Sequence, residues 1–165
     1  MNFPEAVRSR QRLDHLFELA TDLSRDPGCK QEAVARLSEY LCIRVSGFVE
    51  TSVRGVLLDY VTAHSSGQVL DYVDEELARW YNLKEARICD LVGCFSEGWG
   101  DELHVRLVDP MKSSLDAIVE IRNNLAHGQQ FGVSLATARD HYGNILRALR
   151  EVALVCSPQV EYWFL

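Results

Sequence analysis

The apolar residues of this sequence recur at steps of three and four over long segments, and this spacing constrains the fold more than any other feature. The segment 135–156 follows it most closely, with apolar positions at Leu135, Ala138, Tyr142, Ile145, Leu149, Val152 and Cys156. Such spacing puts side chains on one face of an α-helix, where they form a continuous seam for packing against another helix. The pattern therefore predicts an all-α fold.

Similar patterns predict the other helices. One helix is expected over 4–23, ending at the breaker Asp26-Pro27-Gly28, and a much longer one over 31–63. The long helix contains Gly47 and Gly55, where it can bend or be approached closely by a neighbour. Further helices are expected over 68–81, 83–95, 101–108 and the segment before residue 128. We therefore expect an up-and-down helical bundle of about five to seven helices with a long second helix.

Length and composition indicate a single domain. The chain has 165 residues, 47% of them hydrophobic, which is enough for one full core and too little for two. We expect a core over about 11–156 and an apolar tail over 157–165 that docks on its own body or on a second subunit. No apolar run is long enough to cross a bilayer, and the charged N-terminus does not resemble a signal peptide, so we expect a cytoplasmic protein.

The cysteine pattern does not predict a metal site. The five cysteines are odd in number, contain no C-x-x-C, and mostly lie among apolar neighbours, which favours buried free thiols. Cys89 and Cys94 could join His104 as metal ligands, but this spacing matches no structural zinc pattern. We therefore expect no metal and no cofactor.

The most distinctive segment is LDAIVEIRNNLAHG, which ends at Gly128. Its apolar helical face is interrupted just before the glycine by a polar cluster: Arg122, Asn123, Asn124 and His127. Glycine after a helix commonly adopts the left-handed conformation, so we expect His127 in the last turn or at the cap. Helix carbonyls without partners there favour a protonated imidazole, which is a usable state for a general acid near neutral pH.

The spacing of Arg122 and His127, Arg-x4-His, is weak evidence by itself. Arg10 and His15 have the same spacing in an ordinary charged helix. Arg122, in contrast, is followed directly by asparagine, and its histidine is followed by the helix-stopping Gly128. Only this second pair has the context of a functional site.

The run RNNLAHG, late in an all-helical chain of this length, resembles the signature of HEPN domains, in which an arginine and a polar residue precede a histidine. The segments 37–60 and 95–99 resemble the RiboL-PSP-HEPN branch, so the resemblance spans roughly 11–156. It implies a HEPN-like helical dimer and, in many members, a metal-independent endoribonuclease, here a toxin or phage-defence effector with an antitoxin or other protein partner. Some minimal HEPN toxins carry tyrosine two positions after the histidine, where this chain has Gln129. Control through modification of such a tyrosine is therefore not expected.

The chemistry of RNA cleavage suits these residues. Attack by the 2′-hydroxyl needs a proton acceptor, a proton donor for the leaving 5′-oxygen, and positive charge on the phosphorane. His127 can act as base or acid, and Arg122 can bind the non-bridging oxygens through two hydrogen bonds. Asn123 would position the substrate, with Asn124 as a weaker candidate. No step requires a metal.

The helical spacing leaves two arrangements open for this site. Residues five apart lie about 140° apart around a helix, so Arg122 and His127 would not point at one spot on a straight helix. Either the helix loosens before Gly128, or the site combines residues from two copies at a two-fold axis.

Two alternatives concern the surroundings of Arg122. Glu50 and Arg54 could form an exposed ion pair along the long helix, or Glu50 or Arg44 could face Arg122 or His127 and orient it. If the segment is purely structural, Arg122 pairs with a carboxylate such as Glu120 or Asp116, and His127 only fills a capping position.

The net charge of −7 argues against a broad RNA-binding surface, so any contact with RNA should be local, and a basic partner is equally compatible. The best sources of local positive charge are Arg139, Arg147 and Arg150 in the last helix.

Phe95 and Trp99 could stack on a base or form a small satellite core. The acidity and the apolar tail favour an alternative function, a non-catalytic HEPN-like dimerisation or RNA-binding scaffold module.

Overall fold

The computed structural model describes residues 4–65, 67–129 and 132–158, and these ranges contain seven α-helices and no strand. The helices are α1 (Pro4–Arg25), α2 (Gln31–His64), α3 (Gln68–Leu77), α4 (Glu85–Gly93), α5 (Trp99–Arg106), α6 (Met111–Ala126) and α7 (Leu135–Cys156). The predicted all-helical fold with a long second helix is confirmed. The largest difference is α3, which ends at Leu77 and not near residue 81. The chain then continues to a turn at Asn82, which has a left-handed φ of 54°.

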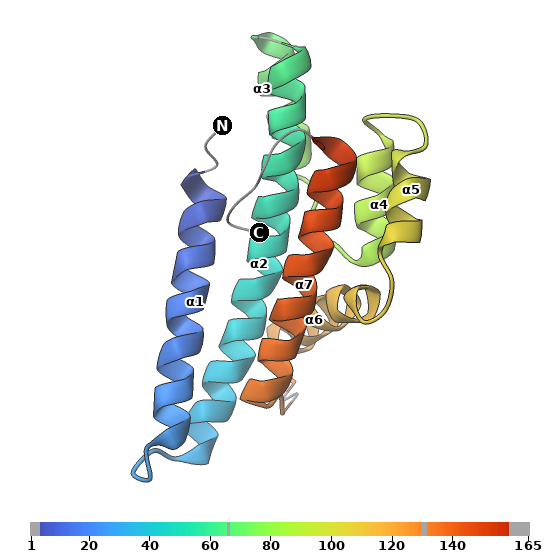
Figure 1. The fold of residues 1–165 in the computed structure, drawn as a ribbon. Helices are drawn as coiled ribbons and strands as arrows, with labels where there is room; N and C mark the ends of the chain where they lie inside the picture. Colours follow the sequence, from blue (N-terminus) through green and yellow to red (C-terminus); the bar gives the residue numbers. More distant parts are fainter. Residues whose placement is uncertain (1–3, 66, 130–131, 159–165) are drawn as a thin grey trace.

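Helix α2 is the centre of the architecture. It lies beside both α1 and α7, and these three long helices run along the length of the molecule (Figure 1). Helix α6 lies across α2 and α7 and packs on both, while α4 and α5 form a pair that contacts α7 through α5. Helix α2 therefore contacts four other helices, α1, α3, α6 and α7.

One connected apolar core draws on all seven helices. Its largest fully buried side chains are Leu13, Leu41, Phe48, Leu57, Ile88, Leu103, Leu107, Leu115, Ile118, Ile121, Ile145 and Leu149. Tyr142 of the predicted seam stacks on Phe17 of α1 with ring centroids 4.9 Å apart and meets Phe48 of α2 edge-on at 6.2 Å. The apolar face of α7 is thus the seam that joins it to α1 and α2.

Several smaller expectations have clear outcomes. Phe95 and Trp99 form a satellite cluster with Tyr60, at centroid distances of 6.4 and 4.8 Å, and do not form an open stacking surface. All five cysteines are free, but Cys94 is exposed, so the expectation of buried thiols is wrong there. Among the described residues no helix is long and apolar enough to span a membrane. The apolar segment 160–165 lies outside the described residues.

Two glycines set how closely α4 and α5 approach each other. A Cβ built on Gly100 would lie only 2.8 Å from the carbonyl oxygen of Cys89 and 3.5 Å from the Cα of Gly93. The obstacle is backbone and cannot turn aside as a side chain could. This approach positions the start of α5, and therefore His104, against α4.

We predict that Gly100→Ala destabilises the protein by about 1–3 kcal/mol, because α5 must move away from α4 to admit the methyl group. Gly143→Ala is the matched control, since apart from the neighbouring backbone of α7 no atom lies within 4 Å of its added Cβ. This control should gain up to about 1 kcal/mol from the higher helix propensity of alanine. Urea denaturation of both variants measures the two changes, and shifts of the same sign would contradict the packing argument.

Candidate functional site

Helix α6 ends in a backbone-bonded cap at His127. The N–H of Gln129 donates to the carbonyl of Asn124 at 2.9 Å, and the N–H of Gly128 donates to the carbonyl of Leu125 at 3.0 Å. Gly128 has the predicted left-handed φ of 76°. These two bonds form a Schellman motif, so the helix is closed by its backbone alone. The exposed ring of His127 makes no hydrogen bond to any residue in the described ranges.

Arg122 lies at the junction of three elements. Its guanidinium donates to Oδ1 of Asn82, in the turn between α3 and α4, and its Nη1 lies 3.6 Å from Oε1 of Glu50 on α2. The same Glu50 oxygen accepts the backbone N–H of Asn82 at 2.9 Å. Glu50 therefore holds both the left-handed turn and the cation of α6, while the Arg122 side chain keeps 33% of its surface exposed.

This arrangement decides between the alternatives for Glu50. Arg54 pairs with Asp74 of α3 at 2.6 Å and does not pair with Glu50. The prediction of an ion pair between Glu50 and Arg54 along α2 is therefore wrong. Glu50 faces Arg122, which is the geometry that an orienting residue needs.

The purely structural alternative for Arg122 named two other carboxylates. Glu120 pairs with Lys84 at 3.0 Å, and Asp116 accepts the backbone N–H of Glu85 at 3.0 Å, so neither is the partner of Arg122. Asn82 is the partner that sequence reasoning missed, because no local pattern connects residues 82 and 122.

Arg122 opens onto a cleft between α1 and α2 with a volume of about 720 Å³. The polar side chains that line it are Glu5, Arg8, Ser9, Arg12, Arg44, Thr51 and Arg122. Four guanidinium groups and one carboxylate therefore face this space, although the whole chain carries a net charge of −7. A cleft lined mainly by one sign of charge concentrates anions locally.

The arginines expected to supply local positive charge on α7, Arg139, Arg147 and Arg150, are exposed but do not line this cleft. Arg139 donates to the carbonyl of Phe17 and to Thr21 of α1, and Arg147 donates to Asn144 of its own helix. The cleft draws its charge from Arg44 of α2, from Arg122 of α6 and from α1, where Arg8 and Arg12 are four residues apart on one helix face. That spacing was a visible signal in the sequence.

The structure brings some of the candidate site residues together and leaves others apart. Arg44 shares the cleft with Arg122, and Glu50 contacts Arg122 directly. Asn123, Asn124 and His127 are accessible at the end of α6, but none of them lines the cleft within one subunit.

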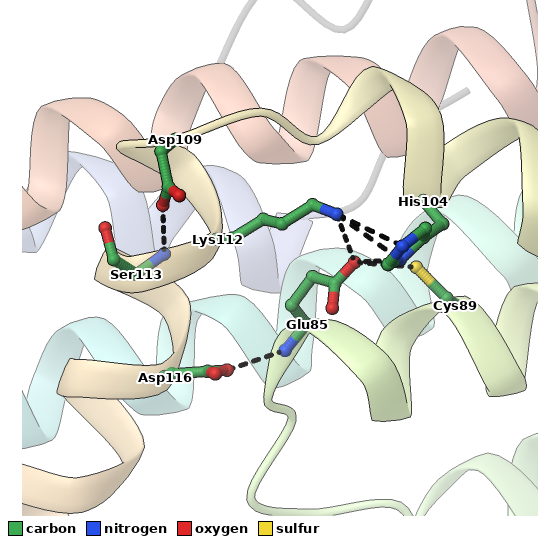
Figure 2. A network of polar contacts seen from close by, with 7 residues as sticks. All are labelled: Glu85, Cys89, His104, Asp109, Lys112, Ser113 and Asp116. Atoms are coloured by element: carbon green, nitrogen blue, oxygen red, sulfur yellow. Dashed lines mark hydrogen bonds and ion pairs between the residues drawn. The ribbon is translucent and has the colours of Figure 1, made fainter.

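A second polar cluster lies between α4, α5 and α6 (Figure 2). Three groups approach Oε1 of the buried Glu85: His104 Nδ1 at 2.7 Å, Lys112 Nζ at 3.4 Å and the donating thiol of Cys89 at 3.6 Å. Burial and the nearby Glu85 carboxylate raise the pKa of Cys89 to about 12, which keeps it a thiol at neutral pH.

The donor atoms of Glu85, Cys89 and His104 lie within 4.8 Å of one another and could in principle hold a metal ion. Cys94, which the sequence grouped with Cys89 and His104, donates to the carbonyl of Asp90 and is not a member. The ammonium of Lys112 stands 3.4 Å from both Glu85 and His104, where it repels another cation. We therefore interpret the cluster as an ion-pair network that fastens α4 and α5 to α6.

Lys112→Met should destabilise the protein by about 1–3 kcal/mol, because it removes the ammonium from a Glu85 side chain that is only 11% exposed. Lys84→Met is the matched control: its pair with Glu120 is exposed, and its loss should change stability by less than about 0.5 kcal/mol. Chemical denaturation curves compare the two variants. Equal effects would mean that the network in Figure 2 adds no more than a surface ion pair.

Comparison with known families agrees with the helical fold. The family model RiboL-PSP-HEPN matches residues 8–156. The chain therefore belongs to the RiboL-PSP-HEPN family, as the motif and helical pattern indicated. Neither the curated proteins nor the solved structures contain a match to it.

Proposed function

We propose that this protein is a metal-independent endoribonuclease that acts as a homodimer and cleaves RNA by attack of the 2′-hydroxyl on the adjacent phosphodiester. The observation that carries the proposal is the pairing of an anchored cation in an arginine-rich cleft with an exposed imidazole five residues later. Membership of the HEPN superfamily supports it.

Arg122 is assigned to the phosphate. The hydrogen bond to Asn82 and the contact with Glu50 hold its guanidinium in one place, so little side-chain freedom remains to be lost when it binds the non-bridging oxygens. Its partly exposed fork can still donate to an oxyanion, where its charge is most useful as the phosphorane forms.

His127 is assigned to proton transfer. Its ring is exposed and has no partner among the described residues, so a substrate hydroxyl or leaving oxygen can approach either nitrogen. Asn123 and Asn124 are the nearest amides along the chain, and we assign them to positioning the substrate.

The dimer is part of the proposal because a single subunit does not bring Arg122 and His127 to the same cleft. His127 does not line the cleft that holds Arg122, whereas a two-fold axis near the end of α6 would bring the His127 of each copy close to the Arg122 of the other. The biological role in this proposal is that of a toxin or phage-defence effector in the cytoplasm. The acidic surface would suit a basic antitoxin.

We expect His127→Ala and Arg122→Ala each to lower RNA cleavage at least about a hundredfold, because each removes a group that acts at the reacting phosphate. The assay incubates purified protein with labelled RNA in EDTA and analyses the ends, which should be 2′,3′-cyclic phosphates. His15→Ala is the matched control, since His15 ends the other Arg-x4-His pair and is exposed on α1.

His15→Ala should cleave like the wild type, and circular dichroism should show that all three variants remain folded. Equal loss in the control, or cleavage that disappears in EDTA, would reject the proposed mechanism. RNA binding without any cleavage by the wild type would favour the scaffold function instead.

Mixing two inactive variants tests whether the site is shared between subunits. If Arg122 of one copy works with His127 of the other, a heterodimer of Arg122→Ala and His127→Ala contains one intact site. An equal mixture should then recover about a quarter of the wild-type activity, because half of the dimers are mixed and each has one of two sites. A mixture as inactive as its components would place both groups of a working site in the same subunit.

A further inference from the structure

The cleft beside Arg122 continues as a groove. A second hollow of about 480 Å³ shares Glu5, Arg8 and Thr51 with the cleft, so the two spaces adjoin along α1 and α2. The second hollow is also lined by Trp80 and Tyr81, which precede the turn at Asn82. The groove therefore combines an arginine-rich part with an aromatic part.

The charges in this groove leave a local excess of cations. Two of its three carboxylates are already paired, Glu50 with Arg122 and Asp74 with Arg54. Within the described part of the chain, Arg8, Arg12 and Arg44 form no ion pair or hydrogen bond, so their donors are available to a ligand. Only Glu5 opposes them without an ion-pair partner among the same residues.

The aromatic part of the groove offers a surface for a flat ring. Tyr81 is 58% exposed, and the guanidinium of Arg87 lies over its ring at 5.6 Å and over that of Trp80 at 5.1 Å. A ring has two faces, and Arg87 can occupy only one face of Tyr81. Tyr81 directly precedes Asn82, which Arg122 holds, so a base on this ring would lie next to a phosphate at Arg122.

We propose that this groove binds single-stranded RNA, with backbone phosphates on Arg8, Arg12 and Arg44 and an unpaired base stacked on Tyr81. A basic groove combined with an aromatic platform is how proteins hold single strands without reading their sequence. A duplex fits less well, because its bases are stacked on each other. The inference rests on the proposed function only in naming RNA, and an acidic protein segment would be the competing occupant.

Binding is measured separately from cleavage by using a labelled 2′-O-methyl single strand, which lacks the attacking hydroxyl. Fluorescence anisotropy with the full-length wild type over a range of salt concentrations gives the affinity and its salt slope. The double variant Arg8→Gln/Arg12→Gln should bind at least about tenfold more weakly, and its logarithmic salt slope should fall by about 1.4. The control Arg25→Gln/Lys30→Gln removes the same charge from exposed positions that line neither hollow, and it should change the affinity less than about twofold.

The stacking assignment has its own pair of variants. Tyr81→Ala should weaken binding about tenfold, whereas Tyr81→Phe keeps the ring and should bind like the wild type. Tyr72→Ala is the control, because Tyr72 is 64% exposed on α3 and lines neither hollow. Equal loss in Tyr81→Phe and Tyr81→Ala would overturn the stacking role.

Glu5→Gln tests the groove through a gain in RNA affinity, which a misfolded variant would not show. Removing the unpaired carboxylate from the groove should tighten binding about two- to fivefold, whereas Glu18→Gln, on the same helix but outside the groove, should not. Unchanged affinity in Glu5→Gln would place the strand elsewhere.

The proposal of an RNA-binding groove and the proposal of nuclease activity can be rejected independently. Binding that needs Arg8, Arg12 and Tyr81 while natural RNA stays uncut would support the groove and reject the nuclease. Cleavage that needs His127 but is accompanied by unaltered binding in all groove variants would support the nuclease and overturn the groove. No binding of the single strand, or equal binding of a duplex, would also overturn the groove.

Discussion

A single carboxylate, that of Glu50, holds together the part of the molecule on which the proposed chemistry depends. It accepts the backbone N–H of Asn82 and lies against the guanidinium of Arg122, so α2, the turn before α4 and α6 meet at one oxygen. The carboxylate is three-quarters buried, where such contacts are stronger than they would be in water. Arg122 is therefore held in the cleft by residues distant from it in the sequence.

This arrangement explains how an acidic protein can offer a site to a polyanion. Elsewhere many carboxylates are paired or face solvent, whereas the cleft collects arginines from α1, α2 and α6 around one unpaired glutamate. A strand approaching the molecule would meet repulsion over much of the surface and attraction in one place. That contrast favours specific docking over general adhesion.

Much of the fold was predictable from the sequence because it depends on local physics. The spacing of apolar residues identified the helices, and Gly128 after His127 identified the cap of α6. The partner of Arg122 was not predictable, because Asn82 reaches it only when α3 and α4 are in place. The location of the arginine-rich cleft was not predictable for the same reason. The sequence does not show that α1 packs beside α2, nor that Arg139 of α7 donates hydrogen bonds to Phe17 and Thr21 of α1.

The cap at the end of α6 has an evolutionary consequence. Because backbone bonds close the helix, the ring of His127 is not needed to fold it, and its replacement by another residue carries little structural penalty. Arg122, in contrast, is tied to two other elements and cannot be exchanged so freely. A lineage of such proteins can therefore lose the histidine, and with it any catalysis, while keeping the arginine and the architecture around it.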